Sequence, residues 1–250
     1  EGVDQAAATR IFRHHPTTIA RWLTRFATLD APLHDRFFAR IIARYIQLDE
    51  LKAKTRRVAE VWVWIALDVS TKLILSFQVG DRSQNRAYAL IHEVANRLPP
   101  GCIPIFSSDG LRMYFYALTA HFGHWMPPAE GQRVPRWHVD PRLLFAQLIK
   151  VKSGYRLKFL KTVVRCGSRD AYRAALQALG FSGLVETAFV ERLNLTLREL
   201  VAPLSRRTWS IADSPLTLTR HLQLGRVYYH FCRPHQSLSI PLKHGRYRKR

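Results

Sequence analysis

Hydrophobic residues follow two different spacings along this chain, and the spacing predicts where strands and helices lie. Three runs predict strands: IQLDELKAKT, CIPIFSSDG and VWVWIALDVS, the last of which is rich in β-branched and aromatic residues. TKLILSFQVG follows the second run after a tight turn, which predicts a hairpin. The stretches NRAYALIHEVANRL and RMYFYALTAHFG place apolar residues three and four apart, which predicts helices. This order predicts an α/β fold, with a mixed sheet flanked by helices.

The first 45 residues have a helical pattern and predict a separate unit. Pro16 disfavours helix at His15 but suits the opening of a second helix over 17–26. Arg21 and Arg25 lie on the flank of that helix, and a third helix is expected from residue 30 onward. A basic second helix after a tight turn indicates a DNA-binding helix-turn-helix over 1–45, with a plain helical hairpin as the alternative.

Residues 124–180 predict a basic insertion within a larger domain over 46–240. The segment begins with a Pro-rich, loop-like stretch and continues with two strand-like runs around KSGY, which predict a β-hairpin. We expect its cations to contact nucleic acid, although charges also occur on exposed sheet edges to prevent strand pairing. These cations are Lys150, Lys152, Arg156, Lys158, Lys161 and Arg165. The last ten residues, 241–250, predict a basic tail that contacts phosphate.

Charge makes a polyanion the expected partner. Lys and Arg number 39 against 18 Asp and Glu, for a net charge of +21. A domain this basic is typical of nucleic-acid binding. The three cysteines lie far apart, which disfavours a cysteine zinc site and fits a reducing cytoplasm. The longest apolar run, VWVWIAL, is too short to span a membrane, and neither a signal peptide nor a lipidation motif is evident.

Three acids stand out in so basic a chain. Asp68 ends the most apolar predicted strand, Asp109 ends the strand IPIFSSD, and Glu191 lies on the amphipathic helix LVETAFVERLNLTLREL. Asn194 and Arg198 follow Glu191 at helical spacing. If the helix packs against the strand ends, the three carboxylates would form a site for Mg²⁺ or Mn²⁺, ions that can clamp a phosphodiester displacement. The alternatives are that Asp68 opens a turn and that Asp109 caps the next helix.

Several passages resemble the DDE transposases of bacterial insertion sequences, which belong to the RNase H-like and retroviral integrase superfamily. The passages are VWVWIALDVSTKLILSFQVGDRS, FSSDGLRMY, FVERLNLTLRELVAPLSRRTWS and YYHFCRPHQSL, and the likeness is greatest to the group named for insertion sequence one. By position, Asp68, Asp109 and Glu191 match the catalytic and metal-binding acids of that family. Asn194 and Arg198 match its accessory residues, with Arg198 expected to meet DNA phosphate.

The resemblance implies an enzyme that uses two Mg²⁺ ions, which Mn²⁺ can replace, to cleave transposon ends and join them to target DNA. It also implies double-stranded DNA as substrate, a homo-oligomer and a bacterial cytoplasmic, nucleoid-associated location. The 124–180 insertion lengthens the gap between the second and third acids, and no cysteine cluster offers a zinc module. An RNase H-like nuclease or resolvase, and a non-catalytic DNA-binding relative of a transposase, are the alternatives.

Overall fold

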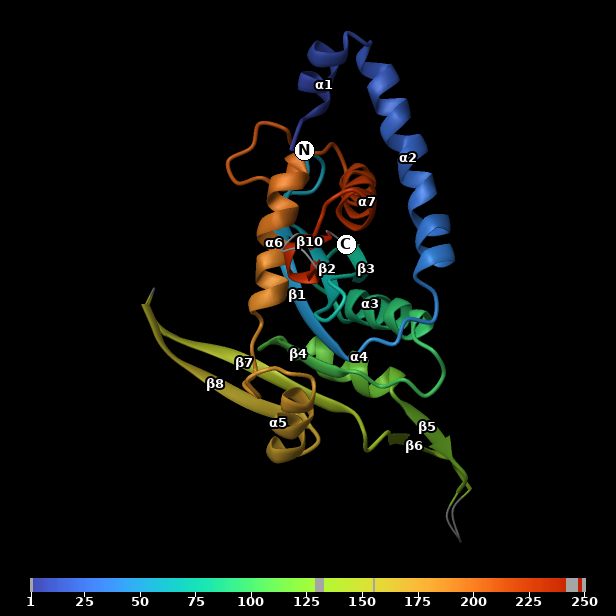
Figure 1. Cartoon of the computed structure of the whole chain (residues 1–250), viewed down its shortest axis with the longest axis vertical. Coiled ribbons are helices and arrows are strands. Elements are labelled where there is room, and N and C mark those ends of the chain that lie inside the picture. Colours follow the sequence, from blue (N-terminus) through green and yellow to red (C-terminus); the bar gives the residue numbers. More distant parts are fainter. Residues whose placement is uncertain (1, 129–132, 155, 242–246, 249–250) are drawn as a thin grey trace.

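A six-stranded mixed sheet forms the centre of the protein (Figure 1). This computed structural model describes residues 2–128, 133–154, 156–241 and 247–248. The strand order is β3-β2-β1-β4-β7-β8. The strands of this sheet are β1 (Tyr45–Ala53), β2 (Val61–Asp68), β3 (Ile74–Gly80), β4 (Ile105–Asp109), β7 (Leu144–Ser153) and β8 (Arg156–Cys166). The predicted α/β class, with a mixed sheet flanked by helices, is confirmed.

The strand directions determine which residues meet at one edge of the sheet. Strands β1, β2 and β3 are successively antiparallel, whereas β4 runs parallel to β1 and β7 runs parallel to β4. The register of the parallel pair places Leu48 beside Ser108, near the carboxyl ends of β1 and β4. Asp68, at the end of the antiparallel β2, pairs instead with Ile46, near the start of β1.

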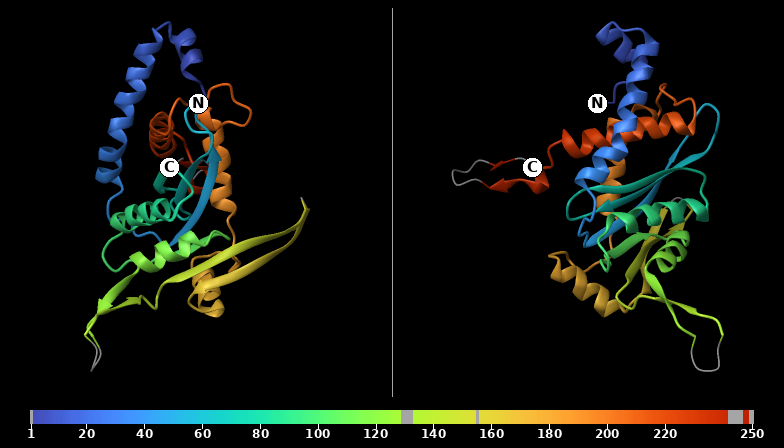
Figure 2. Two further views of the ribbon diagram at one scale, coloured as in Figure 1. Left: turned by 180° about the vertical axis from the view of Figure 1, so that it is seen from behind. Right: turned by 90° about the vertical axis from the view of Figure 1, so that its right-hand side faces the viewer.

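Helices pack on both faces of the sheet (Figures 1 and 2). On one face α3 and α4 bury Leu90 and Leu118 against Leu48 and Phe106. On the other face α6 and α7 cover β2 and β3, and α5 packs near β4 and β7. The helices are α1 (Gln5–Phe12), α2 (Pro16–Phe37), α3 (Gln84–Arg97), α4 (Met113–His121), α5 (Arg169–Ala178), α6 (Ala188–Leu200) and α7 (Pro215–Phe231), with short 3-10 turns η1 (Ala202–Leu204) and η2 (Gln236–Leu238).

The N-terminal arm consists of two helices rather than the three expected from sequence. Pro16 opens α2 as predicted, but α2 continues through Pro32 to Phe37, and residues 38–44 form no third helix. The reason is tertiary: Asp30 and His34 on the second half of α2 are buried against α7, where Arg226 forms an ion pair with Asp30. In Figure 1 the arm rises beyond the sheet, with α1 at its tip.

The predicted basic insertion contains a core strand. Phe145, Ala146 and Gln147 of β7 are fully buried, and β7 pairs with β4, so the first half of this strand belongs to the main sheet. Only the far end of the β7–β8 hairpin projects from the body (Figure 1). The stretch expected to be a loop contains a small hairpin, formed by β5 (Gly123–Met126) and β6 (Arg136–Val139). The indole N–H of Trp137 in β6 donates to the carbonyl of Thr119 at 2.7 Å.

The basic tail lies largely outside the described residues. Its described part, β10 (Tyr247–Arg248), pairs with β9 (Ile240–Pro241). Within the described ranges, no helix combines the length and the apolar character that a membrane crossing requires.

Candidate metal centre

Three carboxylates gather at the carboxyl ends of β1 and β4. Asp49, Glu50 and Asp109 each offer an oxygen atom, and these atoms lie within 4.8 Å of one another. The cause is the parallel register: Leu48 pairs with Ser108, so Asp49 and Asp109 are each one residue further along neighbouring strands. Carboxyl ends of strands in open α/β sheets are where ligands bind. This edge is therefore the candidate functional site.

Asp49 lies in surroundings that oppose its charge. Burial raises the pKa of its carboxyl to about 7, and the charges of Asp109, Glu50 and Glu191 contribute to the rise. The side-chain amide of Asn194 donates to Oδ2 at 2.7 Å, and the backbone N–H of Glu50 donates to Oδ1 at 2.9 Å. A cation beside Asp49 would relieve the repulsion among these carboxylates.

Glu50 faces the opposite side of the sheet from Asp49, because successive side chains of a strand alternate. Its side chain is 2% exposed and forms an ion pair with Arg82, while the hydroxyl of Tyr114 donates to Oε2 at 3.1 Å. Burial and the nearby Asp109 raise the pKa of Glu50, and Arg82 opposes that rise. Glu50 thus has its own counter-charge, and Asp49 and Asp109 are the better candidates for a metal.

Asp109 is fixed by the turn that follows β4. Its Oδ1 accepts the backbone N–H of Leu111 at 3.0 Å. The amide nitrogen of the buried Gln147 donates to the backbone carbonyls of Asp109 and Leu111, at 2.8 and 2.9 Å. Gln147 comes from β7, so the neighbouring parallel strand holds the turn that presents the Asp109 carboxylate.

Glu191 lies in the first turn of α6, and buried Gln47 fixes the start of that helix. Gln47 Oε1 accepts the backbone N–H of Val190, and its Nε2 donates to the carbonyl of Glu186, both at 2.9 Å. Glu191 Oε1 accepts from Lys150 Nζ at 2.6 Å and from the hydroxyl of Thr187 at 2.9 Å. Partial burial raises the pKa of Glu191, but these two hydrogen bonds lower it below its ordinary value.

Asp68 does not lie in this group, so the expectation that it meets Asp109 is wrong. Strand β1 separates β2 from β4, and Asp68 pairs with Ile46, about 10 Å along the strand from Asp49 at the usual rise per residue. Asp68 is fully buried, and its Oδ2 accepts the backbone N–H of Thr71 at 3.1 Å and the hydroxyl at 2.5 Å. Burial raises the pKa of Asp68, against these hydrogen bonds. Its geometry matches the alternative role, in which it opens the turn between β2 and β3.

The residues at the β1–β4 edge fit a hard divalent cation. Asp49 and Asp109 offer carboxylate oxygens at this edge, which Mg²⁺ and Mn²⁺ prefer, whereas Glu191 on α6 is not among the acids whose oxygens lie within 4.8 Å of one another. Asn194 supplies an independent indication: its residue is 8% exposed, Nδ2 bonds Asp49, and Oδ1 is buried without a partner among the described residues. A buried amide oxygen left unpaired beside a carboxylate is costly unless something else satisfies it. A hydrated cation would satisfy it.

The other residues singled out from sequence lie in three places. Arg198 lies further along α6, where Nη1 donates to the carbonyl of Leu204 at 3.1 Å and so fixes the turn that follows the helix. Arg21 and Arg25 are exposed on α2. The hairpin cations are exposed, and apart from Lys150 the ion pairs of the described chain involve none of them. These unpaired cations are Lys152, Arg156, Lys158, Lys161 and Arg165, of which Arg165 donates to Gln147 Oε1 at 2.7 Å.

Sequence reasoning missed Asp49 and Glu50, although the strand that carries them was expected. The run YIQLDELKA places two adjacent acids after four buried residues, Tyr45 to Leu48. Adjacent acids in a strand that is otherwise internal are a detectable signal, because burial of a carboxylate needs a partner. The strand that ends at Asp68 is more apolar than β1, so its acid was the stronger signal in the sequence.

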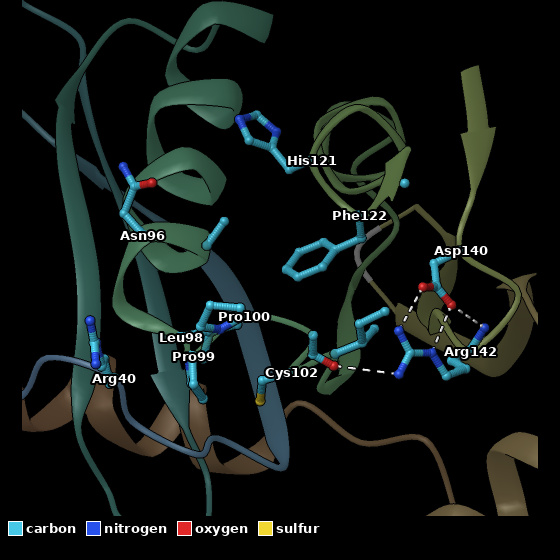
Figure 3. Close-up of a pocket in the computed structure, with 14 residues that line it drawn as sticks. Arg40, Asn96, Leu98, Pro99, Pro100, Cys102, His121, Phe122, Asp140 and Arg142 are labelled. Carbon is cyan, nitrogen blue, oxygen red and sulfur yellow. Dashed lines mark hydrogen bonds and ion pairs between the residues drawn. The ribbon is translucent and has the colours of Figure 1, made fainter. Parts of the chain in front are cut away.

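A pocket of about 510 Å³ lies elsewhere (Figure 3). It is lined by residues such as Leu98, Cys102 and Phe122, beyond the starting end of β4, whereas Asp109 lies at the finishing end. Asp140, at its rim, is already bound by Arg142 in a double contact at 3.0 and 2.8 Å. This pocket brings none of the candidate carboxylates together.

Comparison with known proteins gives no relative from which to transfer a function. No protein-family model matches the sequence, and no curated protein matches it.

Proposed function

We propose that this protein is a DDE-type DNA transposase whose three acids are Asp49, Asp109 and Glu191. The single observation that carries the proposal is the meeting of Asp49 and Asp109 at adjacent strand ends, with oxygens within 4.8 Å. Glu191 on α6 is near enough for its charge to raise the pKa of Asp49. Asp49 takes the role that the sequence resemblance implied for Asp68.

The proposed reaction is phosphoryl transfer on DNA. Asp49, Asp109 and Glu191 would hold two Mg²⁺ ions, or Mn²⁺ in their place. Bound ions supply a deprotonated nucleophile and stabilise charge on the attacking and leaving oxygens. Water would attack a phosphodiester at the transposon end and release a 3′-hydroxyl. That hydroxyl would then attack a phosphodiester of the target DNA.

The fold supports the RNase H-like part of the proposal. The sheet is mixed, helices cover both of its faces, and the acids lie on two neighbouring strands and one helix that packs against them. Asn194 hydrogen-bonds Asp49, which supports its proposed accessory role. Arg198 bonds a backbone carbonyl of its own chain, so a role at DNA phosphate is not needed to explain its position.

Charge supports double-stranded DNA as the substrate. The chain has a net charge of +21 although its candidate site is acidic, so the cations are concentrated elsewhere. We propose that the exposed hairpin cations and the arm cations Arg21 and Arg25 contact the backbone phosphates of transposon ends and target DNA. We also propose that the protein acts as a homo-oligomer, because both DNA ends must be held together for joining. The proposed location is the bacterial nucleoid, where the DNA lies.

Two alternative functions use the same surfaces. A metal-dependent nuclease or resolvase would share the carboxylates and differ only in the joining step. A DNA-binding protein without activity would gain nothing from a half-buried Asp49 whose pKa burial and three neighbouring charges raise to about 7. That observation favours catalysis over binding alone.

A joining assay tests the proposal. Pre-cut DNA ends, taken as a library from the DNA that flanks the coding region, are incubated with the full chain, supercoiled target and Mg²⁺ or Mn²⁺. The proposal predicts covalent joining of a subset of ends to the target. Cleavage without joining would support the nuclease, and DNA binding without either reaction would support the binding protein.

A further inference from the structure

Lys150 is placed to act on the carboxylate site as well as on DNA. It lies on β7 two residues after Leu148, which pairs with Asp109, and side chains two apart share a face of a strand. Lys150 therefore faces the same side of the sheet as Asp109. Its Nζ donates to Glu191 Oε1 at 2.6 Å.

The charge of Lys150 acts on the whole acidic group. The hydrogen bond to Glu191 raises the pKa of Lys150 against partial desolvation, and the charges of Asp49 and Asp109 add to the rise. Lys150 and Glu191 are both nearly half exposed, with side chains 45% and 46% accessible. An ion pair this exposed is weak and exchangeable, because water and salt compete with it.

Beyond Lys150 the hairpin carries exposed lysines that form no ion pair within the described chain. Two of them are Lys152 and Lys158. A phosphate backbone that follows this hairpin would pass beside Lys150. The flexible four-carbon stem of lysine lets one ammonium group reach either partner.

We propose that Lys150 is an exchangeable cation that couples metal binding to DNA binding. It pairs with Glu191 when no metal is present, and it turns to a backbone phosphate when a divalent cation takes over the carboxylates. This inference rests on the proposed metal site. Because coupling is reciprocal, a metal that frees Lys150 must tighten DNA binding by the factor by which DNA tightens metal binding.

The first test measures Mn²⁺ binding to the full chain without DNA, by electron paramagnetic resonance of the free ion. Lys150→Met removes the competing charge, so we expect Mn²⁺ affinity to rise on the order of tenfold, within the usual range of couplings. Arg192→Met is the matched control. It removes an equal charge from the residue next to Glu191, but about 100° round the helix, and should leave the affinity nearly unchanged.

The second test measures DNA affinity by fluorescence anisotropy, with and without Mg²⁺ at constant ionic strength. In the unaltered protein Mg²⁺ should tighten binding of a short duplex. Lys150→Met should remove most of that gain, and Lys150→Arg should restore part of it. Circular dichroism checks that each variant is folded.

The outcomes separate this inference from the proposed function. Equal Mn²⁺ affinity in the unaltered protein and in Lys150→Met, with binding lost in Asp49→Asn, overturns the role of Lys150 and leaves the metal site standing. An equal Mg²⁺ effect on DNA affinity in both proteins overturns it too. Failure of the unaltered protein to bind Mn²⁺ overturns both proposals.

Discussion

Asn194 Nδ2 lies 2.7 Å from Asp49 Oδ2 and joins α6 to β1 by a hydrogen bond between side chains. The same helix carries Glu191, one turn earlier, and the buried Gln47 of β1 bonds the backbone N–H of Val190. Two polar contacts from one strand therefore fix the helix that brings the third acid to the sheet. The site is held by side chains, not by backbone pairing alone.

Replacement of Asn194 tests the importance of that link. Asn194→Ala removes the donor to Asp49 and the unpaired Oδ1, and we expect Mn²⁺ affinity to fall roughly 10- to 100-fold, as for other residues that orient metal ligands. Leu195→Ala, at an exposed position of the same helix, is the control. Equal Mn²⁺ binding by the two variants would show that Asn194 serves only the packing of α6.

Ionisation of Asp49 predicts how the metal-free protein responds to pH. Its pKa is about 7 in the folded protein against an ordinary value of 3.8, so the folded state holds the extra proton between these values. Stability is therefore expected to fall as pH rises from about 4 to 7, and the whole penalty is present above pH 7. Asp49→Asn should raise the thermal midpoint at pH 8, by an amount that shrinks toward pH 4.

Thermal unfolding at several pH values in a chelating buffer checks this prediction. The relevant quantity is the difference between the unaltered protein and Asp49→Asn, because Glu50 and Asp68 also have raised pKa values and contribute in the same direction. A difference that stays constant from pH 4 to 8 would contradict the pKa of Asp49.

The projecting hairpin should contribute to DNA affinity through charge. We expect joint replacement of Lys152, Lys158 and Lys161 by Ala to lower the salt slope of DNA binding by roughly 0.9 for each lysine that neutralises a phosphate. The fold should persist, because these side chains are exposed. A control that replaces Lys54, Arg169 and Arg173 removes the same charge elsewhere. Identical slopes for the two variants would argue for charge in general and against a hairpin interface.

The docking of the arm should weaken in acid. The backbone N–H of Ile74 donates to His230 Nε2 at 2.9 Å, so the proton of a neutral His230 lies on Nδ1, 2.7 Å from His34 Nε2. Burial, and then the nearby charges of His34 and Arg226, hold the pKa of His230 well below 6.5. Once undocked, His230 regains a pKa near its ordinary value, so the undocked state gains protons as pH falls below 6.5.

Hydrogen–deuterium exchange checks the arm. After correction for intrinsic rates, exchange in α2 should accelerate between pH 7 and 5 more than exchange in α3, which lacks this contact. His230→Gln should reduce the difference between the two pH values. Parallel behaviour of α2 and α3 across this range would contradict a role for His230 in docking.

Sequence periodicity predicted the strands of the sheet and the helices α3, α4 and α6, because burial imposes spacings of two and of three to four residues, but it did not predict α5. The exceptions have tertiary causes. Pro32 favours a helix end, yet the Asp30–Arg226 ion pair keeps α2 continuous beyond it. The high charge of residues 124–180 suggested an insertion, yet the buried Phe145 and Gln147 make half of β7 a core strand.

Of the three acids predicted to form one site, the structure places only Asp109 in the carboxylate group at the strand ends. Asp109 ends β4 and Glu191 lies in the first turn of α6, on the strand and the helix that the sequence predicted. Asp68 does not join this group, because strand order decides which ends are neighbours, and order is not visible in local pattern. The antiparallel β2 carries its final residue to the opposite edge, and the adjacent parallel β1 brings Asp49 to the site instead.

One measurement tests the central claim most directly: the joining of pre-cut DNA ends to target DNA by Asp49→Asn and Asp68→Asn, compared at equal protein and Mg²⁺ concentration. Both changes remove one negative charge and keep the side-chain shape, and circular dichroism confirms folding. We predict that Asp49→Asn abolishes joining while Asp68→Asn retains it. Retained joining in Asp49→Asn, with loss in a folded Asp68→Asn, would contradict the proposed site.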